Sequence, residues 1–105
     1  MIAQATLYTQ VGLLLRKRGD LTRALRLLEL AMKLAPDHPD TWINLGVVYQ
    51  DLNQIGQAIN AFQQAHAIAK KNDIKESLHI SELNLALARF RLGPQHALFK
   101  DFLVR

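Results

Sequence analysis

The chain has 105 residues, about half of them hydrophobic and about a fifth charged, as expected for one globular domain. It has no cysteine, which excludes disulfides, thiolate metal sites and a cysteine nucleophile and fits a cytoplasmic location. No apolar run reaches the length of about 18 residues needed for a membrane span. Thirteen basic and nine acidic residues give a net charge of +4, which mildly favours acidic partners and is weak support for nucleic-acid binding.

Apolar residues recur at helical spacing along the whole chain, and strand signals are almost absent. Glycine and proline divide these runs. We predict six helices, at residues 4–17, 21–34, 39–52, 55–70, 75–92 and 94–104. Helices this short are marginally stable alone, and short loops make successive helices antiparallel. The sequence therefore predicts an all-α stack of helical hairpins.

An internal repeat links the first two predicted hairpins. Residues 5–38 align with residues 39–72 at an offset of 34 without a gap, so that small residues meet small ones and large residues meet large ones. Among the aligned pairs are Gly12 with Gly46, Ala24 with Ala58, Tyr8 with Trp42 and Leu28 with Phe62. Because a repeated packing geometry requires such matching, we expect Gly12 and Ala24 to mark the closest approach of their two helices.

On these residues the chain resembles the tetratricopeptide repeat family, whose unit has 34 residues. The family pattern runs aromatic, two free positions, Leu-Gly, two free positions and Tyr, then Ala, an aromatic residue, Ala and Pro. The second unit supplies Trp42, Leu45, Gly46, Tyr49, Ala58, Phe62 and Ala65, with Lys70 in place of the proline. The first unit supplies Tyr8, Val11, Gly12, Leu15, Ala24, Leu28, Ala31 and Pro36. The resemblance implies a right-handed α-solenoid of antiparallel helical hairpins.

The third unit departs from this pattern. Its best offset from the second unit is 40, and Glu82 and Arg89 replace the aromatic residues Trp42 and Tyr49. We therefore predict a single domain over residues 1–105. It is expected to hold one repeat at 5–38, a second at 39–72 and an irregular or capping third unit at 73–105.

The resemblance further implies that the first helix of each hairpin lines a concave face on which ligands bind. The corresponding residues here are Leu13, Arg16, Lys17, Ile43, Asn44, Val47, Leu83, Asn84, Leu87 and Arg91. Leu13, Val47 and Leu87 have no packing role in the family pattern. Either a ligand covers them or they close against one another in a tightly wound stack. Asn44 and Asn84 suit hydrogen bonding to a peptide backbone, or they follow the family consensus.

One subtype of the family holds the carboxylate end of a chaperone tail with two lysines, two asparagines and an arginine. Only Asn44 matches that set, because Thr9, Leu13, Ile80 and Asn84 stand at the other four places. A carboxylate needs those donors, so we do not expect this activity.

A basic cluster surrounds the first hairpin. Its members are Arg16, Lys17, Arg18, Arg23 and Arg26. The cluster suits an acidic partner, a nucleic-acid backbone or an anionic lipid surface, or it is a solvated face near a helix C-terminus, where cations are favoured. No aromatic residue interleaves it, so stacking on bases lacks support.

No catalytic or metal-binding pattern stands out. The four histidines do not pair at helical ligand spacing, and no phosphate loop or nucleophile motif is present. We expect no enzyme activity, no metal and no cofactor. The chain ends in an apolar segment that points to a longer array, to another subunit or to contact with the groove. Its large residues include Leu98, Phe99, Phe102 and Leu103.

The sequence therefore predicts an adaptor or scaffold that binds a protein or peptide partner in its concave groove. A first alternative is a self-associating module that forms a homodimer through the apolar C-terminal segment. A second is a nucleic-acid-binding protein that uses the basic cluster.

Overall fold

The computed structural model describes residues 2–92. This part of the chain contains five α-helices and no strand. The helices are α1 (Ile2–Lys17), α2 (Leu21–Leu34), α3 (Pro39–Asp51), α4 (Ile55–Lys71) and α5 (Lys75–Leu92). They confirm the first five predicted helices, whereas the helix predicted at 94–104 lies outside the described residues.

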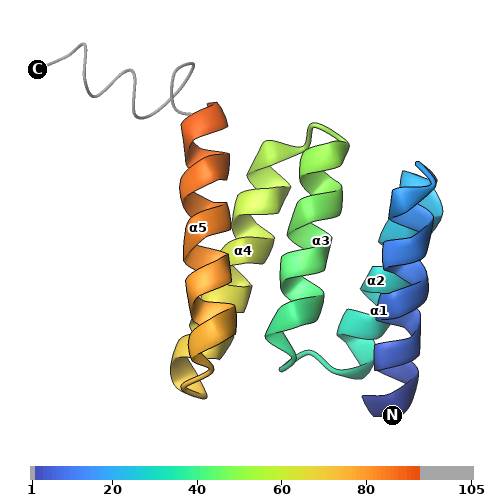
Figure 1. The fold of residues 1–105 in the computed structure, drawn as a ribbon, viewed down its shortest axis with the longest axis horizontal. Coiled ribbons are helices and arrows are strands. Elements are labelled where there is room, and N and C mark those ends of the chain that lie inside the picture. The colour runs from blue at the N-terminus through green and yellow to red at the C-terminus, as the bar shows by residue number, and fades with distance from the viewer. Residues whose placement is uncertain (1, 93–105) are drawn as a thin grey trace, which may run out of the picture.

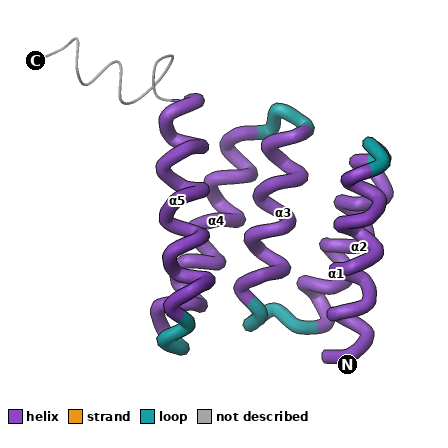
Figure 2. The backbone as a smooth tube through the Cα atoms, viewed as in Figure 1, coloured by secondary structure: helices purple, strands orange, loops and turns teal. Residues whose placement is uncertain are grey.

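The five helices form a solenoid of antiparallel hairpins. Successive helices are joined by short loops at alternating ends (Figure 2). Helices α1, α3 and α5 form one row, with α2 and α4 behind them (Figure 1). Within the first row α1 contacts α3, and α3 contacts α5. The predicted all-α stack is confirmed, and the first helix of each hairpin lies in the same layer.

Three of the four loops use the same tight turn. Gly19, Asn53 and Asp73 each have a positive φ, between 54° and 85°, a conformation open to glycine and tolerated by asparagine and aspartate. In each loop the next residue donates its N–H to a carbonyl five residues back, as Asp20 does to Leu15 at 2.9 Å. The same bond recurs from Ile74 to Ala69. The link from α4 to α5 therefore copies the turn within a hairpin, and α4 continues past Lys70, which stands at the position held by Pro36 in the first unit.

Two apolar clusters make up the core. One joins α2, α3 and α4 through Ala24, Leu28, Leu45, Val48 and Ala61. The other joins α3, α4 and α5 through Ile43, Ala58, Phe62, Ala65, Leu85 and Ala88. Trp42 and Tyr49 pack against both clusters, and the indole Nε1–H of Trp42 donates to the Pro36 carbonyl at 2.8 Å. These two aromatic residues therefore tie the first hairpin to the second.

The expected close approach in the first hairpin is confirmed. A Cβ atom placed on Gly12 would lie 3.0 Å from Cγ of Leu28 and 3.4 Å from the carbonyl oxygen of Ala24. Helices packed at this distance have no room for a larger residue. The matched glycines and alanines are thus a requirement of the hairpin, as the repeat predicts.

None of the helices between residues 2 and 92 has the length and apolar character that crossing a membrane requires. A cytoplasmic location stays a prediction.

Candidate partner-binding groove

Two adjoining hollows lie along the layer of α1, α3 and α5. The first, of about 240 Å³, lies between α1 and α3, and the second, of about 450 Å³, lies between α3 and α5. Asp40 and Asn44 line both hollows, so the two adjoin at α3, and together they are here called the groove. Its other lining residues are Ala5, Thr6, Thr9, Gln10, Leu13, His38, Thr41, Ile43, Ile74, Glu76, Ser77 and Ile80.

The charged residues of this groove are acidic, in contrast to the net charge of the chain. Asp40 lies in the first turn of α3 and Glu76 in the first turn of α5, where the helix dipole favours a negative charge. No lysine or arginine lines either hollow. The groove therefore favours a neutral or cationic segment over an anionic one.

Buried hydroxyl groups hold the helices of the groove together. The hydroxyl oxygens of Thr9 and Thr41 lie 3.4 Å apart between α1 and α3. Between α3 and α5, the Ser77 hydroxyl donates to Oδ1 of Asp40 at 2.9 Å. Thr41 and Ser77 are both buried. Because these contacts cross between hairpins, they fix the spacing of the groove walls.

The predicted basic residues of the concave face lie beyond the two hollows. The Arg16 guanidinium pairs with the Asp51 carboxylate of α3 and donates to it through two nitrogens. Both side chains are about one-third exposed, and such pairs contribute about 1 kcal/mol or less. Lys17 and Arg91 are exposed in the last turns of α1 and α5. Of these three residues, Arg16 is the one that the fold itself engages.

The apolar residues of the predicted concave face differ in how deeply they are buried. Ile43 is only 7% exposed and belongs to the core cluster with Phe62, and Val47 packs against the same cluster. Val47, which has no packing role in the family pattern, therefore packs against the core here, and Ile43 is part of that core. Leu85 of α5 belongs to the same cluster. Leu13 lines the first hollow.

The predicted binding residues of α5 contribute little to the two hollows. Leu83 and Leu87 are exposed and line neither hollow. The Asn84 amide donates to the Ile80 carbonyl of its own helix at 2.9 Å, so it is already engaged, whereas Asn44 lines both hollows. The structure thus brings Leu13, Ile43 and Asn44 together in the groove.

The groove wall also includes Ser77 and Ile80, which are not among the residues predicted to bind a partner on the concave face. These residues precede Asn84 at helical spacing, so a stripe drawn back from Asn84 finds both. The prediction left this stripe out because the third unit aligns with the second at an irregular offset of 40.

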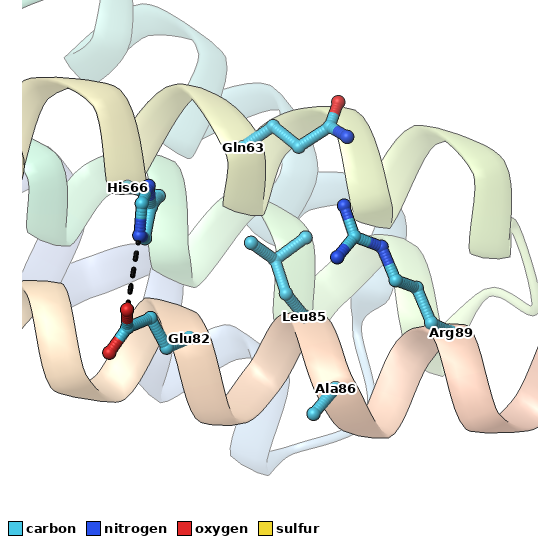
Figure 3. A pocket seen from close by; sticks show the side chains of 6 residues that line it. All are labelled: Gln63, His66, Glu82, Leu85, Ala86 and Arg89. Carbon is cyan, nitrogen blue, oxygen red and sulfur yellow. Dashed lines mark hydrogen bonds and ion pairs between the residues drawn. The ribbon is translucent and has the colours of Figure 1, made fainter.

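A further hollow of about 410 Å³ lies between α4 and α5 (Figure 3). Nε2 of His66 lies 3.4 Å from Oε2 of Glu82 at one end, and Arg89 reaches toward α4 at the other. Glu82 and Arg89 stand where the second unit has Trp42 and Tyr49. Polar side chains therefore border this hollow at the two positions where the second unit has aromatic ones. None of the predicted site residues lines it.

The basic cluster is less uniform than its sequence indicates. Arg16 pairs with Asp51, and Arg23 pairs with Asp20 at 3.3 Å. Lys17, Arg18 and Arg26 are exposed. The apolar residues predicted for self-association lie outside the described part of the chain, namely Leu98, Phe99, Phe102 and Leu103.

Within residues 2–92, no three or more histidine, cysteine or acidic side chains come together in a way that would hold a metal ion.

Comparison with known proteins agrees with this architecture. The tetratricopeptide repeat family model matches residues 3–71, about two-thirds of the chain. The chain therefore belongs to the tetratricopeptide repeat family. This fold generally mediates protein–protein interaction, and members of the family are typically non-enzymatic scaffolds.

Solved structures show the same fold. A tetratricopeptide repeat domain protein from Salinibacter ruber is 22% identical to this chain in two structures. Its crystal structure superposes with a TM-score of 0.74, covering 81% of this chain and 96% of that one. Its solution structure gives 0.80, covering 92% and 97%. At this level of identity the likeness shows the fold alone. No curated protein sequence matches the chain.

Proposed function

We propose that this chain is an adaptor that holds a segment of a protein partner in the groove formed by α1, α3 and α5. The observation that carries the proposal is that Asp40 and Asn44 line both of the adjoining hollows. Together they offer apolar walls, an amide and two carboxylates on one surface. This combination suits a peptide that presents its backbone to Asn44 and a cationic side chain to Asp40 or Glu76.

The groove has the character of a peptide site rather than of a small-molecule site. It is open along the helix layer and lined by side chains from three helices, as in grooves that hold an extended segment or a helix. Each apolar side chain of the partner that is buried there contributes about 1.5–3 kcal/mol, before the cost of ordering the segment. We therefore expect micromolar affinity, about 8 kcal/mol.

Selection from a random peptide library displayed on phage tests the proposal. The recovered peptides should be enriched in lysine and arginine, and soluble copies should bind the chain in fluorescence titrations. Asn44→Ala and Ile80→Ser should each weaken binding by about tenfold, about 1.4 kcal/mol. Leu83→Ser is the matched control, because Leu83 lies on the same helix outside the hollows.

Binding that is unchanged in Asn44→Ala and Ile80→Ser would show that the groove is not the site. Acidic peptides whose binding is weakened by Asn44→Ala would contradict the role assigned to Asp40 and Glu76.

A further inference from the structure

The outer side of α1 carries apolar residues at positions that are buried in the next hairpin. In α3, Leu45 and Val48 are 2% and 0% exposed because they pack against Ala24 and Leu28 of the preceding hairpin. At the repeat offset of 34, the equivalent residues of α1 are Val11 and Leu14, and Leu7 precedes them on the same stripe. Leu7 and Leu14 are 56% and 60% exposed, and Val11 is 36% exposed.

Helix α2 continues this surface. Ala61 of α4 belongs to the cluster shared with the preceding hairpin, and its equivalent in α2 is Leu27. Leu30 and Leu34 follow Leu27 at helical spacing, and both are exposed. Because α1 and α2 together form one end of the stack (Figure 1), these residues and those of α1 make one apolar surface, here called the end face.

The end face is apolar and exposed in the described part of the chain, and large exposed apolar patches mark interaction sites. Here a hollow of about 240 Å³ lies on it, lined by Val11, Leu14, Leu15 and Arg18. Within residues 2–92, no other segment covers these side chains.

The charges around the end face have one sign. Arg18 continues the stripe of Leu7, Val11 and Leu14, and Arg26 lies one turn before Leu30. Both arginines are exposed, and neither takes part in an ion pair formed within residues 2–92.

The acidic residues of the first hairpin lie elsewhere. Asp20 caps α2 and pairs with Arg23. Glu29 is close enough to Tyr49 of α3 to affect its pKa, and Asp37 lines a hollow with residues of α4. None of these carboxylates neutralises Arg18 or Arg26.

We propose that the end face is a second docking surface, separate from the groove, for an amphipathic helix of another protein with acidic residues flanking its apolar stripe. The apolar positions of two packed helices form a shallow seat for a third helix, as the next hairpin shows within this chain. Two cationic residues beside the seat favour a negatively charged partner. A second copy of this chain would add two more arginines and no unpaired carboxylate to the same interface, so the excess of positive charge disfavours a symmetric dimer through this face.

The test uses a fluorescein-labelled helical peptide of about 18 residues, about five turns, with leucine on one stripe and glutamate beside it. A second peptide carries lysine in place of every glutamate, and both are titrated against Asn44→Ala with Ile80→Ser, because the groove itself is expected to bind cationic segments. We expect the acidic peptide to bind the chain at least about tenfold more tightly than the basic one. Its affinity should fall as salt is raised, because surface charges are screened.

Two double variants, each with a matched control, separate the apolar contribution to binding from the contribution of charge. Leu7→Ser with Leu14→Ser should weaken binding of the acidic peptide at least about tenfold, whereas Leu83→Ser with Leu87→Ser, equally exposed leucines on α5, should leave it unchanged. Arg18→Gln with Arg26→Gln should weaken binding and reduce its salt dependence, whereas Lys70→Gln with Lys71→Gln should not. All eight residues are exposed, so the variants are expected to fold, and circular dichroism checks this.

Three outcomes would overturn the proposal. The basic peptide binds as tightly as the acidic one, or binding survives in Leu7→Ser with Leu14→Ser. The third outcome is that sedimentation equilibrium shows a dimer that becomes a monomer in that same variant, since a second copy would then be the occupant. Ile80→Ser, which alters the groove alone, should retain binding, so failure of the groove proposal leaves this one intact.

Discussion

The ring of Phe62 occupies the space that a side chain on Gly46 would need. A Cβ atom at Gly46 would lie 2.6 Å from Cδ1 and 2.7 Å from Cζ of this ring, closer than real Cβ atoms come to a neighbour. Phe62 is fully buried, so its ring has nowhere to move. The contact between the two helices of the second hairpin therefore depends on the absence of one carbon atom.

Gly46→Ala should consequently lower the free energy of unfolding by about 1–3 kcal/mol, the usual cost of overpacking a core. Gly12→Ala should cost less, because its added carbon would meet Leu28 at 3.0 Å rather than an aromatic ring. Gly56→Ala is the matched control. Nothing lies within 4 Å of its added carbon, so alanine should stabilise α4 by up to about 1 kcal/mol. Urea unfolding curves measure the free energy of unfolding of all three variants. Equal effects would contradict the close packing of Phe62 against Gly46.

Val47 and Leu87 stand at equivalent predicted positions but should respond differently to a charge. Val47 packs against the core cluster of α3, α4 and α5, so Val47→Asp places a carboxylate there at a cost of at least about 2 kcal/mol. Leu87 is 53% exposed, and Leu87→Asp should change stability by about 0.5 kcal/mol or less. Thermal melts followed by circular dichroism distinguish the two. Similar melting temperatures would mean that Val47 is not part of the core.

Asp20 caps the N-terminus of α2, where its carboxylate accepts the backbone N–H of Arg23 at 3.2 Å. Asp20→Ala should therefore cost about 0.5–2 kcal/mol. Asp20→Asn keeps a capping oxygen and should lose only the exposed ion pair with Arg23, which is worth about 1 kcal/mol or less. Asp37→Ala, in the exposed loop before α3, is the control. An Asp20→Asn variant as unstable as Asp20→Ala would show that the ion pair matters more than the cap.

Burial raises the pKa of the Tyr49 phenol above its usual range, and the nearby carboxylate of Glu29 raises this pKa further. The folded state therefore holds the phenolic proton more tightly than the unfolded state. The resulting stabilisation is complete below the unfolded pKa of about 10 and is lost as pH rises through the folded pKa. Stability should thus fall in alkaline solution.

Glu29→Gln should lower the pKa of Tyr49 but leave it above its usual range, because burial is the larger cause. Absorbance of the phenolate measures this in a Tyr8→Phe background, since Tyr8 is the other of the two tyrosines. An unchanged titration in Glu29→Gln would rule out the charge of Glu29 as a cause.

The helices and their pairing were predictable because their signals are local. Breakers such as Gly19 and Pro39 mark helix ends, and the apolar spacing between them fixes the buried stripe of each helix. The matched pairs Gly12 with Gly46 and Ala24 with Ala58 also predicted where the two helices of each hairpin touch. A small residue that recurs at a fixed offset indicates a close contact that recurs in each hairpin. The family resemblance rests on the same residues. The division into units at 5–38, 39–72 and 73–105 stays a prediction.

The candidate groove was only partly predictable, because exposure on a solenoid depends on which helix comes next. Val47 and Leu87 have the same place in their helices, yet α5 covers the first of them and no residue between 2 and 92 covers the second. Leu45 and Val11 differ for the same reason at the other end of the stack. The amino-acid pattern thus determined the hairpins and their small contact residues, whereas the stacking of one hairpin on the next decided which apolar side chains became core and which remained surface. That difference is physical: the shape of a helix follows from spacing within one segment, but burial requires a neighbouring surface that only the assembled stack supplies.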